Sequence, residues 1–377
     1  MENHKQLFPL TGLLCGLSVL PLEPPHPVSA VLLIGVAAML ASTMLFDARG
    51  RKAFLFKTAL VARGALQMVA GKDKKWKKKG RPDPALVAFA KDKKTKRLIF
   101  IRHGESEWNL IFNVGWKIFV PFKAVAALVR ETLMFLRLED DSVLYDSPLN
   151  EEGLKQAREL DHLLNAYDST SPGFADVEAL RGSSDRTSVV TSSNLRRAAQ
   201  TVQLALATRL EKHPKEKVHI LTALQEISTN IDTLAITLPF AAPVLGGVPR
   251  HLATPDRFDV SCNSGNKLLG GRGLQRLQGF SEWVFKRDED VIIVGGHSLY
   301  FRYFFREFLP AGSNPLGARD SKVANGGIVS LTLERGTVDS GELNVAPQVQ
   351  YRIVPESICE VVLGFDDGQK KKKKKKV

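Results

Sequence analysis

The stretch Arg97-Leu-Ile-Phe-Ile-Arg-His-Gly-Glu-Ser-Glu-Trp-Asn109 decides how this chain of 377 residues is interpreted. Its first half has the composition of a short buried strand, and its second half is a polar loop that opens with Arg102-His103-Gly104. An imidazole is a competent nucleophile at neutral pH, a guanidinium fits phosphoryl oxygens, and a glycine lets backbone approach a ligand. The stretch therefore indicates a phosphate-handling site at the end of a strand.

Apolar runs alternate with segments of helical periodicity along the rest of the chain. Strands are expected at residues 98–101, 188–191, 218–221 and 291–294, and helices at residues 151–166, 195–210 and 273–285. Such alternation is typical of a mostly parallel sheet with helices on both faces, a three-layer α/β/α architecture. Ligands of open sheets bind at the carboxyl ends of strands, where His103 is expected.

Two further patches follow expected strands in the same way. Thr191-Ser-Ser-Asn-Leu-Arg-Arg-Ala-Ala-Gln-Thr201 opens a helix, and Val291-Ile-Ile-Val-Gly-Gly-His-Ser298 ends a strand in two glycines and a histidine. Together with the first stretch, they resemble the signature of the histidine phosphatase superfamily, in its phosphoglycerate-mutase-like branch. The resemblance covers residues 96–365.

The resemblance implies the groups that handle the phosphoryl group. His103 is the expected nucleophile, and Arg102 and Arg197 are the expected ligands of the phosphoryl oxygens, so that Arg196 points elsewhere. His297 is expected to hydrogen-bond the phosphoryl group in the transition state. Phosphoryl transfer requires mainly positioning and charge neutralisation, so no cofactor is expected. The spacing of the eight His and three Cys residues suggests no metal site.

The leaving oxygen also needs a proton, and the resemblance places the donor at Glu226, just after the strand expected at 218–221. A carboxyl group near a phosphate and shielded from water can supply that proton. Glu105 is the competing donor. The expected substrate-binding set is Arg102, Gly104, Ser106, Asn109, Arg197 and His297.

The family contains both phosphatases and mutases. Its mutases usually carry glycine after the second histidine, where this chain has Ser298, and extra arginines in the segment after the acid. Residues 227–246 contain neither Arg nor Lys. We therefore expect a phosphomonoester hydrolase with a phosphohistidine intermediate, whose substrate is a phosphorylated small molecule, a lipid phosphate or a phosphoprotein. A phosphoglycerate-type mutase and a non-catalytic phosphate-binding membrane module remain the alternatives.

The N-terminal region has the pattern of a membrane anchor. Residues 28–46 carry no charge, and this length is close to the roughly 20 apolar residues that cross a bilayer. Residues 7–22 form a shorter apolar run that either crosses with the first or lies in the interface. Basic residues follow the longer run, which places the catalytic domain on the cytosolic side. Three cysteines without disulfide spacing agree with a reducing compartment.

The net charge of +13 belongs to the flanks of the domain, since residues 49–97 carry 17 Lys and Arg against 3 acidic residues. The clusters at 72–79 and 370–376 are expected to bind anionic membrane lipids. Nucleic acid is not expected, because a single aromatic residue interleaves the first cluster. The terminal lysines also resemble a dilysine signal of endoplasmic reticulum membrane proteins.

The expected organisation has four parts. They are a membrane anchor at 1–52, a basic juxtamembrane linker at 53–95 with an amphipathic helix at 53–70, the catalytic domain at 96–365, and a disordered polylysine tail at 366–377. Within the catalytic domain, residues 111–143 form an insertion that predicts an amphipathic basic helix broken by Pro121. This helix either faces the membrane, caps the substrate or extends the core.

Overall fold

The computed structural model describes residues 37, 48–76, 82–112, 120–137, 139, 141–338 and 347–366. The chain divides into two compact units, Met1–Ala62 and Arg63–Val377. The expected membrane segments, apart from Ala37, and the polylysine tail beyond Asp366 lie outside the described residues. Helix α3 (Ala48–Ala70) begins in the first unit and ends in the second.

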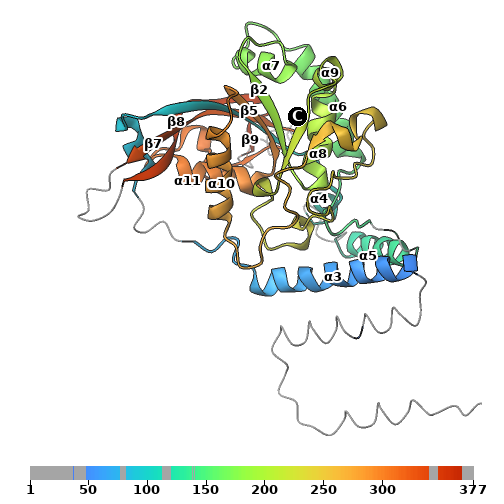
Figure 1. Cartoon of the computed structure of the whole chain (residues 1–377). Helices are drawn as coiled ribbons and strands as arrows, with labels where there is room; N and C mark the ends of the chain where they lie inside the picture. The colour runs from blue at the N-terminus through green and yellow to red at the C-terminus, as the bar shows by residue number, and fades with distance from the viewer. Residues whose placement is uncertain are drawn as a thin grey trace, which may run out of the picture. The chain divides into compact units, whose positions relative to one another are not determined.

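A seven-stranded sheet forms the centre of the second unit (Figure 1). Its order is β4-β3-β2-β5-β1-β7-β8. The strands are β1 (Lys94–Arg102), β2 (Ser188–Ser193), β3 (Val218–Leu221), β4 (Phe258–Asp259), β5 (Val291–Gly296), β7 (Ile328–Val338) and β8 (Gln348–Val362). Strands β1 to β5 run parallel, and β7 and β8 complete one edge in antiparallel pairing. A separate antiparallel pair joins β6 (Lys322–Val323) and β9 (Phe365–Asp366).

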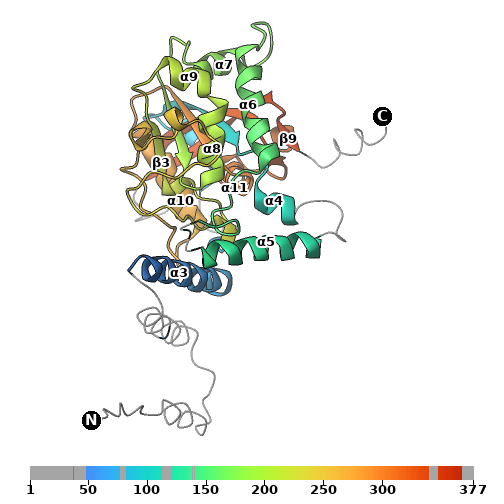
Figure 2. The ribbon, with the colours of Figure 1, turned by 90° about the vertical axis from the view of Figure 1, so that its right-hand side faces the viewer.

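Helices cover both faces of this sheet (Figure 2). One face packs against α6 (Glu151–Asn165), α7 (Phe174–Arg181), α8 (Arg196–Ala205) and α9 (Ala207–Lys212), and the other against α10 (Gly273–Phe285) and α11 (Ser298–Phe308). Short 3-10 helices are η1 (Pro84–Phe89), η3 (Thr222–Leu224), η4 (Ile231–Thr233), η5 (Arg250–Leu252), η6 (Pro255–Arg257) and η7 (Pro315–Gly317). The predicted three-layer architecture with a mostly parallel sheet is confirmed.

The sequence of β1 explains why it lies inside the sheet. Leu98 and Phe100 point into the core under α10 and α11, whereas Ile99 and Ile101 point into the core under α6 to α9. Burying each such side chain contributes about 1.5–3 kcal/mol. Phe100 also stacks on Phe301 of α11, with the ring centroids 4.3 Å apart. A strand that is apolar on both faces is thereby fixed between two helical layers.

Two expected elements differ from those observed. The helix expected at 195–210 is divided at Leu206 into α8 and α9, because Leu206 has φ −117° and ψ 23°, outside the helical range. The linker expected at 53–95 is not separate throughout, since residues from Arg63 onward belong to the same compact unit as the sheet.

The described parts of the 111–143 insertion include α5 (Val120–Leu136), which follows α4 (Glu107–Phe112) along the chain. Pro121 lies in the first turn of α5 instead of breaking a helix, and this position tolerates proline because its N–H would have no partner there. Apolar side chains of α5 are exposed at helical spacing: Phe122, Val125, Val129, Leu133 and Leu136. By length and composition alone, Gly50–Ala70 of α3 could cross a membrane.

Candidate active site

The two motif histidines lie next to each other because their strands are neighbours. Strands β1 and β5 are parallel and pair Arg102 with Gly296, so the next residues, His103 and His297, leave the same edge of the sheet together. The backbone N–H of His103 donates to the carbonyl of Gly296 at 3.1 Å. The two imidazole centroids are 5.2 Å apart. Two histidines almost two hundred positions apart in the sequence thus lie close enough for both rings to contact one phosphoryl group.

His103 is held in the form that a nucleophile requires. Its Nδ1 lies 2.7 Å from the carbonyl oxygen of Gly104, which can only accept, so Nδ1 carries the proton and Nε2 keeps its lone pair. Nε2 accepts from Nε of Arg197 at 3.3 Å. Burial, reinforced by Arg197 and Arg102, lowers the pKa of His103 well below its usual value. The imidazole is therefore neutral at physiological pH.

Arg197 reaches His103 from the first turn of α8. Its guanidinium donates to the Asp232 carbonyl at 2.8 Å and pairs with the Asp232 carboxylate at 3.2 Å. Thr201, one helical turn later, donates to the Arg197 carbonyl and accepts from the Gly104 N–H at 3.1 Å. Arg196 points away, as expected, and donates to the backbone of Asp146 and Ser142.

Asp232 is a residue that sequence reasoning missed. Burial, opposed by Arg197 and reinforced by Glu226, raises the pKa of Asp232 to about 6. Its Oδ1 is buried without a hydrogen bond in the described part of the chain. A signal existed, because Asp232 is the only charged residue in the stretch 227–246 that follows the expected acid.

Arg102 and His297 each present buried nitrogen atoms that have no hydrogen-bond partner among the described residues. Arg102 donates to the Val323 carbonyl at 2.6 Å, but its Nε has no partner in the part of the chain that the structure describes, and burial lowers its pKa to about 10. Neither ring nitrogen of His297 has a hydrogen bond among the described residues, and burial lowers its pKa well below the usual value. Buried polar groups are normally satisfied, so such unpaired donors around a nucleophile mark a place for an anion.

Glu226 lies close enough to Arg102 to raise the pKa of that guanidinium against the effect of burial. One carboxyl oxygen, Oε1, accepts from the backbone N–H of Tyr300 at 2.8 Å and from its own neighbour Ile227 at 3.1 Å. The competing donor, Glu105, is turned to the start of α6, where it accepts from Asn150 at 3.1 Å. This geometry favours Glu226 over Glu105.

The other expected substrate contacts have structural partners of their own. The Gly104 N–H is engaged by Thr201, and a Cβ on Gly104 would lie 2.7 Å from the Gly153 carbonyl, so close packing explains this glycine. Ser106 accepts from the backbone N–H of Asn109 at 3.3 Å at the start of α4. Contacts of these three residues with a phosphate remain predictions.

The two glycines before His297 have a packing reason as well. A Cβ on Gly295 would lie 2.2 Å from Val202 of α8, and one on Gly296 would lie 2.8 Å from the ring of Phe301. Helices on both faces therefore approach the end of β5 more closely than any larger residue permits. This approach brings α8, which carries Arg197, and α11, which carries Tyr300, to the same strand end.

Three further features bear on what the site could hold. Within the described residues, no group of three or more His, Cys, Asp and Glu could hold a metal ion. A cavity of about 840 Å³, lined by residues of η1, α10, α11 and β8, contains none of the predicted catalytic side chains. Lys322 stands near Arg102 and Glu226, and although it is exposed, partial desolvation, reinforced by Arg102, lowers its pKa. It is a further cation that the motifs did not predict.

Neither a protein-family model nor a curated protein matches this chain. Similar solved structures include a candidate alpha-ribazole-5'-P phosphatase from Escherichia coli K-12 MG1655, with 17% identity over 69% of this chain and 96% of that chain and a TM-score of 0.32. TTHB049 from Thermus thermophilus has 18% identity over 67% and 98%, with a TM-score of 0.27. Phosphoglycerate mutase from the same organism has 20% identity over 67% and 97%, with a TM-score of 0.28. One of these proteins is named as a phosphatase and another as a mutase.

Proposed function

We propose that this chain is a membrane-attached phosphomonoester hydrolase that works through a phosphohistidine on His103. The observation that carries the proposal is the state of His103, a neutral imidazole whose Nε2 lone pair faces Arg197 while Nδ1–H is held by a carbonyl. His297, 5.2 Å away, offers ring nitrogens without hydrogen-bond partners in the described part of the chain. A nucleophile ringed by cationic and donor groups matches the needs of phosphoryl transfer.

The reaction follows from these positions. Nε2 of His103 attacks the phosphorus of a monoester, and the bond to the leaving oxygen breaks while Arg102, Arg197 and His297 hold the phosphoryl oxygens. Glu226 gives its proton to the leaving oxygen, so an alcohol departs. Water then loses a proton to the Glu226 carboxylate and attacks the phosphohistidine, which releases inorganic phosphate and restores His103.

The role of His103 is tested in the full chain in mild detergent. We expect His103→Ala to lower kcat/KM on an aryl phosphate by about 10⁴-fold or more, because loss of a nucleophile removes the covalent pathway. His251→Ala is the matched control, since His251 is an exposed imidazole bonded to Glu211. Acid-labile label from a ³²P-monoester should be trapped on wild type and not on His103→Ala. Full activity in His103→Ala would overturn the scheme.

The reaction type is tested with the same label. Release of ³²P as inorganic phosphate in the presence of a phosphoglycerate supports a hydrolase. Its retention on the acid in a new position would instead support the mutase. Binding of the monoester with neither acid-labile label on the protein nor turnover would support the non-catalytic phosphate-binding module.

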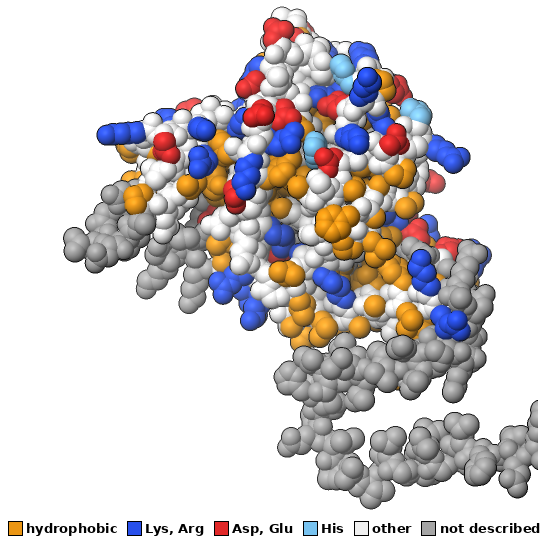
Figure 3. Space-filling model, in the orientation of Figure 1, with side chains coloured by type: hydrophobic (Ala, Val, Ile, Leu, Met, Phe, Trp, Pro, Cys, Tyr) orange, Lys and Arg blue, Asp and Glu red, His pale blue; other side chains and the backbone are white. Residues whose placement is uncertain are grey.

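We also propose that the catalytic unit works at a membrane surface on the cytosolic side, with the endoplasmic reticulum suggested by the terminal lysines. Supporting features are the exposed apolar face of α5 and the exposed Lys72, Lys74 and Lys75. Figure 3 shows hydrophobic side chains beside lysines and arginines in the lower part of one face, with most acidic side chains above. Such a mixture suits anionic lipid head groups.

This surface is tested by a nitroxide label on the full chain in anionic vesicles. A label at Val129→Cys on α5 is expected to collide with oxygen dissolved in the lipid. Leu163→Cys on α6 is the matched control, because Leu163 is a similarly exposed apolar residue on another helix. Equal oxygen accessibility at the two positions would contradict the membrane contact of α5.

A further inference from the structure

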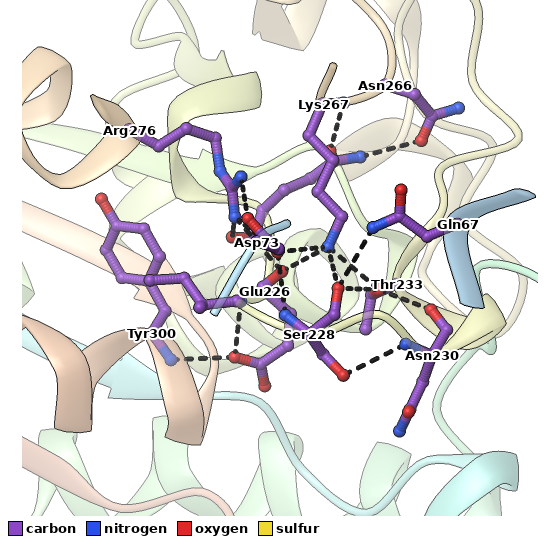
Figure 4. Close-up of polar contacts among 12 residues, drawn as sticks. Gln67, Asp73, Glu226, Ser228, Asn230, Thr233, Asn266, Lys267, Arg276 and Tyr300 are labelled. Atoms are coloured by element: carbon purple, nitrogen blue, oxygen red, sulfur yellow. Dashed lines mark hydrogen bonds and ion pairs between the residues drawn. The ribbon is translucent and has the colours of Figure 1, made fainter. Parts of the chain in front are cut away.

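Lys267 is a buried cation that the proposed mechanism does not use. It is 3% exposed, and its ammonium lies 2.7 Å from the Glu226 carbonyl and 2.6 Å from the Ser228 carbonyl (Figure 4). The Asp73 carboxylate lies 2.9 Å from the same ammonium. Burial lowers the pKa of Lys267 to about 8, and Asp73 is the main group that opposes this shift. A buried ammonium persists only when it is paired in this way.

Asp73 belongs to the turn after α3, far upstream of the motifs. Its carboxylate also accepts from Arg276 of α10 at 2.5 Å and from the backbone N–H of Ser228 at 3.0 Å. Burial opposes ionisation of Asp73, but Lys267 and Arg276 outweigh it and hold its pKa below the usual value. One carboxylate thus pairs with two cations, both of which contact the loop that carries Glu226.

These contacts hold the backbone on both sides of Glu226. Arg276 donates to the carbonyls of Gln225 at 3.2 Å and Glu226 at 3.4 Å, in addition to the bond from Lys267. Asp73 fixes the N–H of Ser228, two residues later. Figure 4 shows the Glu226 side chain turned away from this cluster, toward the backbone of Tyr300. Charged side chains therefore hold the main chain around Glu226 through hydrogen bonds, whereas the Glu226 carboxyl group takes no part in this cluster.

Other residues of the same upstream segment contact the same region. Arg63 donates to the Lys267 carbonyl at 2.9 Å, and Gln67 donates to the Ser228 carbonyl at 3.4 Å. The ring of Trp76 lies 5.0 Å from that of Tyr303 on α11. The segment 63–76 is thus built into the wall of the site, although it lies outside the span of the motifs.

We propose that Asp73 is a positioning residue for the reaction, which acts through Lys267 and Arg276 to hold the Glu226 carboxyl group against the leaving oxygen. The inference rests on the proposed role of Glu226. It extends the active site beyond residues 96–365, into the turn that follows α3. Proton delivery to the leaving group then depends on the placement of a segment that is continuous with α3.

A comparison of two leaving groups tests this role in the full chain. An alkyl phosphate requires a proton on its leaving oxygen, whereas p-nitrophenolate leaves without one, and kcat/KM reports the steps through departure of the leaving group. We expect Asp73→Asn to lower kcat/KM on the alkyl phosphate at least about tenfold more than on p-nitrophenyl phosphate, since small displacements of catalytic groups have large effects. Glu226→Gln should change this ratio in the same direction.

Asp176→Asn is the matched control, because Asp176 is also buried and ion-paired, with Arg97 at 2.6 Å. A general loss of folded protein lowers the apparent kcat/KM on both substrates by the same factor. The Asp176→Asn variant should therefore leave the ratio of the two kcat/KM values unchanged. If Asp73→Asn does not fold, Asp73→Asn/Lys267→Met removes the unpaired ammonium and should fold while keeping the altered ratio.

The outcomes separate this inference from the proposed function. A wild-type ratio in the folded Asp73 variant, beside an altered ratio in Glu226→Gln, would overturn the positioning role alone. A wild-type ratio in Glu226→Gln would overturn both the role of Glu226 and the inference built on it. An altered ratio in Asp176→Asn as large as that in Asp73→Asn would also overturn the positioning role.

Discussion

Among single residues, Asp232 shows how burial sets the charge of this site. Its carboxyl group contacts Arg197, yet burial outweighs that attraction and raises the pKa to about 6. Above that pH the group becomes an anion beside the guanidinium that we expect to bind phosphate. Substrate and the ionised Asp232 would then compete for Arg197.

Asp232→Asn tests this competition. The ratio of kcat/KM between variant and wild type should rise by up to about tenfold per pH unit above pH 6, because only the wild type forms the competing anion. The pH profile of each protein on the same aryl phosphate gives this ratio and cancels ionisation of the substrate. Asp259→Asn, which removes a carboxylate paired with His219, is the control. A ratio that does not change with pH would contradict the competition.

Sequence motifs identified side chains that the structure brings together, but they did not identify the residues that hold those side chains in place. His103, Arg197 and His297 follow strands or open a helix in recognisable patterns, and the structure brings them together. Asp73 and Lys267 belong to no motif, since their roles arise only when distant segments fold against each other. The approach of a ligand to Gly104 stays a prediction, and the structure adds a packing reason for this glycine, the close approach of the Gly153 backbone.

Among the elements, strands and helices of the βα units were predicted closely. Strand β3 and helix α10 have the bounds that the apolar runs and periodicity indicated. The division between α8 and α9 was not foreseen, because no Gly or Pro marks Leu206. The long antiparallel pairing of β7 with β8 lies outside the four strands expected from the sequence. Its register depends on the partner strand and includes an irregularity between Ser330 and Thr332.

The end of β5 is the element on which we expect the site to depend most. Gly296→Ala should destabilise the fold by about 1–3 kcal/mol, because the new methyl group would lie 2.8 Å from the Phe301 ring and force α11 away. Activity should fall further than stability explains, since α11 carries the Tyr300 N–H that binds Glu226. Denaturant titration and kcat/KM on an alkyl phosphate measure the two effects.

Gly279→Ala is the matched control for that substitution. A Cβ on Gly279 meets nothing within 4 Å, and the residue is exposed within α10. Replacing an exposed helical glycine by alanine should stabilise the fold by roughly 0.5–1 kcal/mol. Equal effects of the two substitutions would show that the end of β5 is not tightly packed.

For the molecule as a whole, the charge at one edge of the sheet affects stability. Two buried imidazoles lie there beside two arginines, and this environment disfavours protonation of the imidazoles. The two motif histidines, His103 and His297, follow neighbouring strands, and Arg102 and Arg197 lie close to His103. Burial and these cations keep both imidazoles neutral in the native state. The catalytic arrangement should therefore make the folded state sensitive to acid.

The sign of this effect follows from the two pKa values. Each buried imidazole has a native pKa well below 6.5, so the unfolded chain binds more protons than the native chain once the pH falls below about 6.5. The contribution of the two neutral imidazoles to the free energy of unfolding is complete above that pH. It is lost below that pH, by up to about 1.4 kcal/mol per pH unit for each imidazole. Asp232 acts in the opposite direction below pH 6, since its native pKa is raised.

His297→Gln removes one of these two titrations. Urea unfolding of the full chain in mild detergent should show that the loss of stability from pH 6.5 to 5.5 is smaller in this variant, by about 1 kcal/mol, because the unfolded imidazole is only half protonated at pH 6.5. His251→Gln is the control, because its exposed imidazole is solvated in both states. An equal loss in His297→Gln and wild type would mean that His297 takes up its proton in the folded state as readily as in the unfolded chain. That result would contradict the neutral, buried imidazole from which we derive its role as a donor to the phosphoryl group.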